Sequence, residues 1–302
     1  MEYVATIGFY DGVHRGHRFL IQQTVNEAKR RNLPPMLITF DRHPMSVINP
    51  DNVPECLNTL EERYVLLEQI LRQYAGMDVA GRVVVLRFTR EMSGMTACDF
   101  MDKILRSEYG VKTLIMGYDH HFGHGGGTYQ QCAEWGRKLN MDVLLAKELT
   151  GEQISSSSIR RYIKDGEMES ANHLLGYPFQ LQGCVVAGHK VGHTIGFPTA
   201  NIQIADEKLL PPGGAYAVKV VTEQDGTHMG MMNIGCRPTF HNGNKRSIEV
   251  HLLDFDGNLY GSRLCVLIFY RLRVEKEFCS VEALSLQLQK DAEETRNYFN
   301  RL

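Results

Sequence analysis

The chain changes its sequence pattern near residue 177, and this change limits the folds that it can adopt. Before it, short apolar runs of strand length alternate with longer stretches of helical period, whereas after it one strand-like run follows another. With 302 residues the chain is long enough for two domains, because a domain usually contains about 100–200 residues. Length alone leaves one large α/β unit as the alternative. The pattern favours two domains, 1–177 and 178–302, with Pro178 ending the preceding helix.

The first half is predicted to form a parallel sheet covered by helices on both faces. Amphipathic stretches such as Leu60–Tyr74, in which apolar residues recur every three or four positions, separate its strand-like runs. Those runs are Val4–Phe9, Met36–Phe40, Val83–Phe88, Thr113–Gly117 and Val143–Ala146. In such α/β sheets, ligands bind beyond the carboxyl ends of the strands. We therefore expect the chemistry of this half in the loops that follow its strands.

The second half is predicted to be an antiparallel barrel or sandwich. Turn signals such as Asp225-Gly226 and Asn242-Gly243 separate its strand-like runs. The runs are Gln180–Ala187, Ala200–Ile204, Ala215–Thr222, Met229–Ile234, Ile248–Asp254 and Leu264–Leu272. A final helix is expected at Val281–Phe299. The two halves thus have the patterns of different folds.

Composition excludes several classes of protein. Apolar residues make up 43% and charged residues 23%, as is ordinary for a soluble globular protein. No apolar run approaches the roughly 18 residues of a membrane span, and the first residues lack a signal-peptide pattern. A net charge of −2 argues against a general nucleic-acid surface, and seven scattered cysteines without a Cys-x-x-Cys pair favour reduced thiols. We expect a cytoplasmic monomer or weak homo-oligomer with no membrane or nucleic-acid partner.

The segment after the first predicted strand has the residue types of a phosphate site. Three glycines let its backbone pass close to a ligand: Gly8, Gly12 and Gly16. His14 and His17 fall on one side of the first turn of a helix expected at about Arg18–Arg31, where they can donate hydrogen bonds to phosphate oxygens. A zinc site and a pair of surface histidines are the alternatives. Zinc normally takes three or four ligands, and surface histidines do not explain the glycine spacing, so the phosphate interpretation is favoured.

This His-x-Gly-His segment resembles the signature of the α/β nucleotidyltransferases, and Ile154–Arg160 resembles their second signature. In the second segment, Ser155, Ser156 and Ser157 can cap a helix whose N–H groups face a phosphate, and Arg160 can bind that phosphate through two hydrogen bonds. Taken alone, the serines indicate an ordinary helix cap. The two segments together imply a Rossmann-like nucleotidyltransferase domain in which His14, His17 and Arg160 are catalytic.

Two further loops resemble the flavin-specific adenylyltransferase module of prokaryotes. They are residues 39–44 and 117–128, which follow the second and fourth predicted strands. The resemblance implies flavin contacts near Asp119 and Phe122. The histidines of the second loop need no metal, since a glycine-rich loop beside a phosphate site accounts for the sequence. One departure from the family is Phe9-Tyr10, where Asn-Phe is usual.

The second half resembles riboflavin kinase. Residues 183–201 contain a Pro-Thr-Ala-Asn box at 198–201, and residues 232–240, 248–255 and 259–261, together with Leu272-Arg273, also match the pattern. Over essentially the whole chain the two modules resemble the bifunctional prokaryotic riboflavin kinase/FAD synthetase family. The resemblance implies a β-barrel of riboflavin kinase type with a terminal helix.

The same resemblance assigns roles to residues of the second half. Thr199 and Asn201 are oxygen ligands with one residue between them, and they are expected to hold Mg²⁺ and the phosphates of ATP. Glu249 is expected to accept the proton of the riboflavin 5′-hydroxyl, although strand alternation alone would make it an ordinary outward-facing residue. Glycines expected to wrap the phosphates are Gly188, Gly192 and Gly196, and Arg273 is expected to contact the flavin.

The expected function is synthesis of flavin cofactors in two ATP-dependent steps. Riboflavin is phosphorylated to FMN, and FMN is then adenylylated to FAD with release of pyrophosphate. One alternative is a nucleotidyltransferase of another specificity with an accessory β-domain, which leaves the Pro-Thr-Ala-Asn box unexplained. The other is a non-enzymatic flavin-binding or regulatory module, which has little use for a His-x-Gly-His loop.

Overall fold

The computed structural model describes residues 1–76, 80–117, 125–187, 196–222, 226–237 and 245–302. The chain divides into two compact units, Met1–Ser156 and Ser157–Leu302. The first contains a parallel sheet and the second an antiparallel barrel, so the predicted fold class is confirmed.

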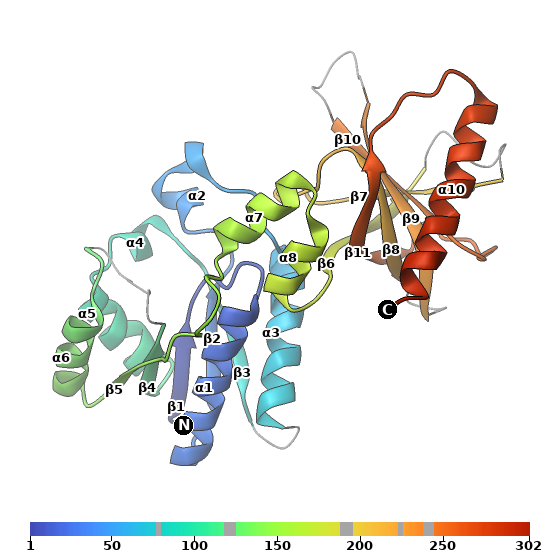
Figure 1. Ribbon diagram of the computed structural model, residues 1–302. Helices are drawn as coiled ribbons and strands as arrows, with labels where there is room; N and C mark the ends of the chain where they lie inside the picture. The colour runs from blue at the N-terminus through green and yellow to red at the C-terminus, as the bar shows by residue number, and fades with distance from the viewer. Residues whose placement is uncertain (77–79, 118–124, 188–195, 223–225, 238–244) are drawn as a thin grey trace. The chain divides into compact units, whose positions relative to one another are not determined.

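The sheet of the first unit has five strands that are all parallel to their neighbours (Figure 1). They are β1 (Tyr3–Ile7), β2 (Pro35–Phe40), β3 (Arg82–Leu86), β4 (Val111–Met116) and β5 (Asp142–Leu145). Their order in the sheet is β3-β2-β1-β4-β5. From β1 the chain continues to β2 on one side of the sheet, whereas from β4 it continues to β5 on the other side. The carboxyl ends of β1 and β4 are therefore where a ligand crevice is expected.

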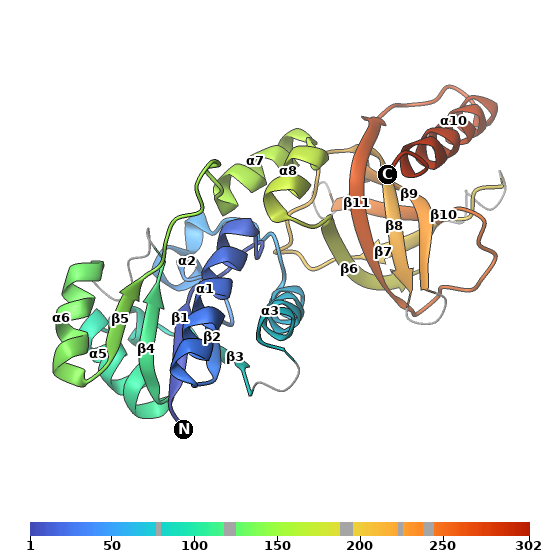
Figure 2. The same cartoon turned by 60° about the horizontal axis from the view of Figure 1, so that its bottom comes forward.

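Helices cover both faces of this sheet because successive residues of its strands point to opposite sides. On β1, Ala5 and Ile7 belong to a core that includes Phe100, whereas Val4 packs with Ala28 of the opposite layer. Figure 2 shows α1 lying against β1 and β2. The helical segments are α1 (Arg15–Arg31), α2 (Met45–Ile48), η1 (Pro50–Asn52), α3 (Leu60–Ala75), α4 (Arg90–Ser93), α5 (Ala97–Asp99), the π-helix η2 (Phe100–Glu108) and α6 (Tyr129–Leu139).

Helix α1 begins at Arg15, whereas the sequence predicted a start near Arg18. The difference arises because His14 is the N-cap, a role usually taken by Ser, Thr, Asp or Asn. Its ring nitrogen Nδ1 accepts a hydrogen bond of 3.3 Å from the backbone N–H of His17. The predicted phosphate loop therefore includes the first turn of α1.

The second unit is a closed antiparallel barrel with strand order β10-β7-β6-β11-β8-β9. Its strands are β6 (Phe179–Val186), β7 (Ala200–Gln203), β8 (Gly214–Thr222), β9 (Gly226–Arg237), β10 (Lys245–Leu252) and β11 (Arg263–Val274). The structure thus decides between the barrel and the sandwich. Helix α10 (Val281–Phe299) packs on the barrel where Ala292 meets Met231 and Leu253.

Helices α7 (Ser156–Asp165) and α8 (Met168–Leu175) precede the barrel. Asn172 of α8 joins two neighbouring strands, because its side chain donates to the carbonyl of Ile268 at 2.9 Å and accepts from the N–H of Phe179 at 2.7 Å. Contacts of this kind group the two helices with the barrel, although the sequence pattern favoured a boundary at 177/178. The domain boundary stays a prediction.

Candidate active sites

The first unit has a cavity of about 190 Å³ beyond the carboxyl ends of β1 and β4, where the strand order predicts a ligand site. Its lining consists of His14, Gly16, His17, Phe19, Leu20, Gly117, Ala146, Lys147, Leu149, Glu152, Ile154, Ser155 and Ser156. Segments from four separate parts of the sequence therefore meet at one cavity. Among them are both histidines and two serines that the sequence indicated.

The two histidine rings are stacked, with centroids 3.6 Å apart and planes inclined by 16°. Glycine at position 16 suits this arrangement, since a Cβ there would lie only 3.2 Å from the His14 ring, which would then have to shift. Because Nδ1 of His14 accepts the N–H of His17, the proton of the neutral ring resides on Nε2. His14 is thus held by its own helix as a hydrogen-bond donor.

Burial keeps both rings uncharged in the free protein. It lowers the pKa of His14 from 6.5 to about 4, and it places the pKa of His17 well below 6.5, with the neighbouring His14 as a second cause. Uncharged imidazoles still donate one N–H each. The pair can therefore bind a phosphate through directed hydrogen bonds, together with the N–H groups at the start of α1, rather than through two fixed positive charges.

Asp11 fixes the loop between β1 and the histidines. Its buried carboxylate accepts backbone N–H groups from Leu57, at 2.9 and 3.1 Å, and from Asn58, at 3.2 Å. Its own carbonyl accepts a 2.8 Å hydrogen bond from the hydroxyl of Ser156. The second signature therefore holds the first in place through a serine side chain.

The departure from the family at Phe9-Tyr10 does not fill this cavity, since neither side chain lines it. The Phe9 ring lies 4.1 Å beneath the guanidinium of buried Arg63, which also donates to the carbonyl of Phe40 at 2.6 Å. Tyr10 is buried with its ring edge-on to His17, at a centroid distance of 5.3 Å, and its hydroxyl donates to Thr6 at 3.3 Å. Both aromatic side chains therefore pack against neighbouring residues outside the cavity and support the loop there.

In the second unit, strand pairing and one hydrogen bond bring together the three predicted kinase residues. Asn201 of β7 lies directly opposite Glu249 of β10 in the antiparallel register. The hydroxyl of Thr199 donates to a carboxylate oxygen of Glu249 at 3.4 Å. The Pro-Thr-Ala-Asn box and the predicted base thus form one polar cluster, although they are about 50 residues apart in the sequence.

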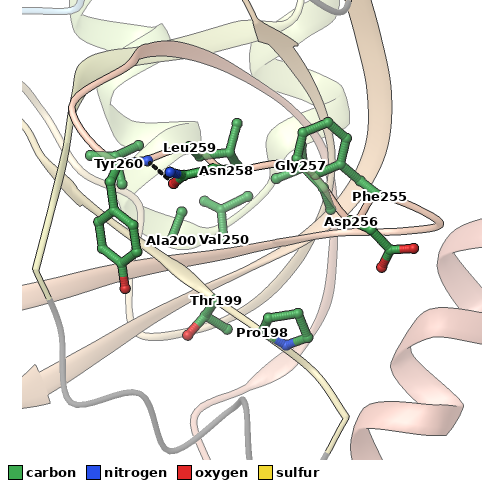
Figure 3. A pocket seen from close by; sticks show the side chains of 12 residues that line it. Pro198, Thr199, Ala200, Val250, Phe255, Asp256, Gly257, Asn258, Leu259 and Tyr260 are labelled. Atoms are coloured by element: carbon green, nitrogen blue, oxygen red, sulfur yellow. Dashed lines mark hydrogen bonds between the residues drawn. The ribbon is translucent and has the colours of Figure 1, made fainter.

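Two cavities meet at Thr199. One of about 430 Å³ is lined by Val185, Pro198, Thr199, Ala200, Val250, Leu252 and residues 255–260. Figure 3 shows Thr199 and Pro198 at one edge of it, with Tyr260 and Phe255 at opposite ends. The other cavity, of about 280 Å³, is bordered by Glu249 and Arg273 among several polar side chains, but most of its wall surface is apolar, with contributions from Phe197, Met231, Phe278, Leu284 and Leu288.

Arg273 is held by Asp291 of α10 in the second cavity. Its Nε lies 3.0 and 3.2 Å from the two carboxylate oxygens, and one terminal nitrogen lies 2.9 Å from Oδ2. Asp291 also accepts from Gln287 at 2.8 Å and is almost fully buried. These hydrogen bonds fix the orientation of the Arg273 guanidinium in the wall of the cavity.

Comparison with protein families separates the same two parts of the chain. The family model for FAD synthetase matches residues 1–160, and the family model for riboflavin kinase matches residues 175–299. Bifunctional riboflavin kinase/FMN adenylyltransferases from Listeria monocytogenes and Escherichia coli K12 are each 36% identical to this chain; the matches cover 99% and 98% of it and 93% and 92% of the relatives. The enzyme of that name from Bacillus subtilis is 33% identical, with 99% of this chain and 93% of the relative covered.

The chain belongs to the bifunctional riboflavin kinase/FMN adenylyltransferase family.

A solved structure described as a macrolide-efflux protein from Streptococcus pneumoniae is also similar to this family member. It is 30% identical, with a TM-score of 0.85, and the match covers 98% of this chain and 94% of that one. Among the helices that the structure describes, none is long and apolar enough to cross a membrane.

The structure places some of the remaining residues indicated by the family resemblance and leaves others undescribed. Gly8 follows β1 and donates its N–H to the carbonyl of Ile38 at 3.0 Å, and Gly12 and Gly196 have the positive φ angles of 83° and 79° that glycine adopts readily. Ser157 and Arg160 lie in α7, within the second compact unit. Asp119, Phe122, Gly188 and Gly192 lie outside the described residues.

Several residues that line the cavities of this family member were not indicated by any motif in the sequence. Lys147 and Glu152 line the first cavity, and Glu152 forms an ion pair with Arg15 of the His-x-Gly-His segment, whose guanidinium donates to its carboxylate at 2.6 Å. The hydrogen bonds of Gln23 in α1 fix the Lys147 backbone at 2.8 and 3.1 Å. A signal was available for Lys147, which follows β5 as ligand-binding residues often do, but no motif marked Glu152 or Asp291.

We predict that the first unit becomes less stable to unfolding at acid pH because His14 becomes protonated when the chain unfolds. A pKa of about 4 in the folded chain and 6.5 in the unfolded chain means that the unfolded state binds more protons between these values. The free energy of unfolding should therefore fall by roughly 3 kcal/mol as the pH drops from above 6.5 to below 4. Urea unfolding followed by Trp135, the single tryptophan of the chain and a residue of α6, measures this unit.

His14→Asn is the matched variant for this measurement, because Asn caps a helix well but does not titrate. Its pH dependence should be smaller than that of the parent chain. Equal slopes in the two proteins would contradict the assigned role of His14.

Proposed function

We propose that the two cavity systems of this chain catalyse the two family reactions separately. The riboflavin kinase and FMN adenylyltransferase activities are those of its family. The barrel would phosphorylate riboflavin in the site that contains Glu249. The first unit would adenylylate FMN in the site that contains His14 and His17. The observation that carries the proposal is the contact between Thr199 and Glu249, at the point where two cavities meet in the barrel.

In the barrel, the apolar cavity suits a flavin ring and the neighbouring, more open cavity suits the nucleotide. Glu249 lines the apolar cavity, and Thr199 lines both. The 5′-hydroxyl oxygen of riboflavin forms a bond to the γ-phosphorus of ATP, its proton passes to the Glu249 carboxylate, and the bond to the ADP oxygen breaks. Arg273, which is held by Asp291 and lines the same cavity as Glu249, would contact the flavin.

The donor set beside Glu249 fits Mg²⁺. Thr199 and Asn201 supply a hydroxyl and an amide oxygen, and magnesium commonly takes one or two protein oxygens together with substrate phosphates. In the described part of the chain, no three His, Cys, Asp or Glu side chains are grouped to hold a metal by themselves. When bound with ATP, Mg²⁺ would neutralise charge on the phosphates; Thr199 and Asn201 would hold it, and Glu249 would stay available for the proton.

In the first unit, catalysis requires no protein nucleophile. A phosphate oxygen of FMN attacks the α-phosphorus of ATP, and pyrophosphate leaves. His14 and His17 would orient the phosphates through hydrogen bonds. The catalytic role of Arg160, which lies in the second compact unit, stays a prediction. A cavity of about 190 Å³ is smaller than the two substrates together, so it would hold the phosphate portion of ATP with the remainder outside it.

We also propose a cytoplasmic location, and a monomer or weak homo-oligomer as the working form. In the described part of the chain, the cysteines Cys56, Cys98, Cys132, Cys184, Cys265 and Cys279 are all free thiols, which suits a reducing compartment. The expectation that no nucleic acid or membrane is a partner stays a prediction.

Product analysis tests the proposed function. We expect the purified chain to convert riboflavin into FMN and FAD when ATP and Mg²⁺ are supplied, and to form neither product in excess EDTA. FMN without FAD would contradict the adenylyl site, and FAD formed only from supplied FMN would contradict the kinase site. Product formed at an equal rate in EDTA would contradict the assigned role of Thr199 and Asn201 as metal ligands.

A further inference from the structure

Strand pairing ends immediately before the residues that face Glu249. Strands β7 and β10 pair at Asn201 with Glu249 and at Ala200 with Val250, and β7 begins at Ala200. Thr199 and Pro198 therefore lie beyond the paired part of the strand. Backbone that precedes a strand in this way would be free to shift unless a side chain holds it.

The side chain of His251 forms a hydrogen bond with this segment. Its Nδ1 lies 2.8 Å from the carbonyl oxygen of Pro198, and its ring meets that of Phe197 edge-on, at a centroid distance of 5.2 Å. A carbonyl oxygen only accepts, so Nδ1 carries the proton and donates. The ring thus holds the peptide that joins Pro198 to Thr199.

The same strand carries the bond and the predicted base. His251 and Glu249 are two residues apart on β10, so their side chains point to the same side of the strand, and both line the apolar cavity. The Glu249 carboxylate accepts the hydrogen bond of the Thr199 hydroxyl, while His251 donates to the carbonyl of Pro198, just before Thr199. Together they fix Thr199 from both directions.

We propose that His251 is a positioning residue for phosphoryl transfer, which acts by holding the Pro198 carbonyl so that the Thr199 hydroxyl stays beside Glu249. The proposal rests on the proposed kinase function of the barrel. Both the neutral and the protonated ring carry the proton on Nδ1, so the bond does not depend on ionisation of the ring.

The test compares His251→Leu, which removes the donor, with His251→Asn, whose side-chain amide can donate from nearly the same position as Nδ1. We expect the Leu variant to lose about 10- to 100-fold in kcat for FMN formation, in line with a small displacement of a reacting group. The Asn variant should stay within about threefold of the parent chain. Riboflavin affinity, measured from flavin fluorescence in the absence of ATP, should change less than threefold in both variants.

A double-mutant cycle with Thr199→Ala separates this mechanism from a general effect on the cavity. If His251 acts through Thr199, the Leu substitution should reduce kcat by less than twofold once the hydroxyl is absent. Losses that multiply in the double variant would overturn the proposal, as would an Asn variant as slow as the Leu variant. A Leu variant that no longer binds riboflavin would also overturn it, because the ring would then be supporting the barrel rather than one carbonyl.

Failure of the underlying function gives a different result. In that case the parent chain itself would form no FMN, whereas failure of the His251 proposal leaves the parent chain active. The unmodified chain is therefore assayed first under the same conditions.

Discussion

Replacement of Glu249 by Gln is expected to slow FMN formation by roughly 10²–10⁴-fold, the usual contribution of a general base. The amide keeps the size of the side chain in the cavity beside Thr199 but cannot accept the proton of the 5′-hydroxyl. Adenylylation of supplied FMN should stay within about twofold, because the histidine pair lies in the other compact unit. Chromatographic separation of riboflavin, FMN and FAD from each half-reaction measures both rates.

Glu293→Gln is a suitable control for this change, since it makes the same substitution at an exposed position on α10. It should leave both half-reactions unchanged. A Glu249→Gln chain that forms FMN at the parent rate would show that Glu249 only accepts the hydrogen bond of Thr199, as an ordinary strand residue could.

Replacement of His17 by Ala is expected to produce the reverse pattern. FAD formation should fall by about 10²–10³-fold, the effect of removing one preorganised donor, while FMN formation stays within about twofold. The substitution also removes the ring that stacks on His14 at a centroid distance of 3.6 Å, so the orientation of the second imidazole is affected as well. Single-turnover formation of FAD from FMN and ATP measures the loss without interference from product release.

His173→Ala, at an exposed position of α8, is the control for the loss of an imidazole elsewhere in the chain. It should retain both activities. The separation of the two sites would be refuted if His17→Ala abolished FMN formation as well, because one residue of the first unit would then be needed for both reactions.

Much of the fold could be predicted because hydrophobic periodicity is a local property of the chain. The runs at Met36–Phe40 and Val143–Ala146 correspond to β2 and β5 within a residue, and the final helix was predicted with its observed bounds. The start of α1 was misplaced because a histidine took the capping role, and the capping rules assign that role to other residue types.

The family and the two reactions were determined by the sequence alone, because the His-x-Gly-His segment and the Pro-Thr-Ala-Asn box are contiguous and can be read without a structure. Only the tertiary structure decided how these segments are arranged. Antiparallel register sets Asn201 opposite Glu249, the burial of a stacked pair leaves His14 and His17 uncharged, and α10 brings Asp291 to Arg273. These relations join residues far apart in the chain and depend on packing and desolvation, so no local pattern could have expressed them.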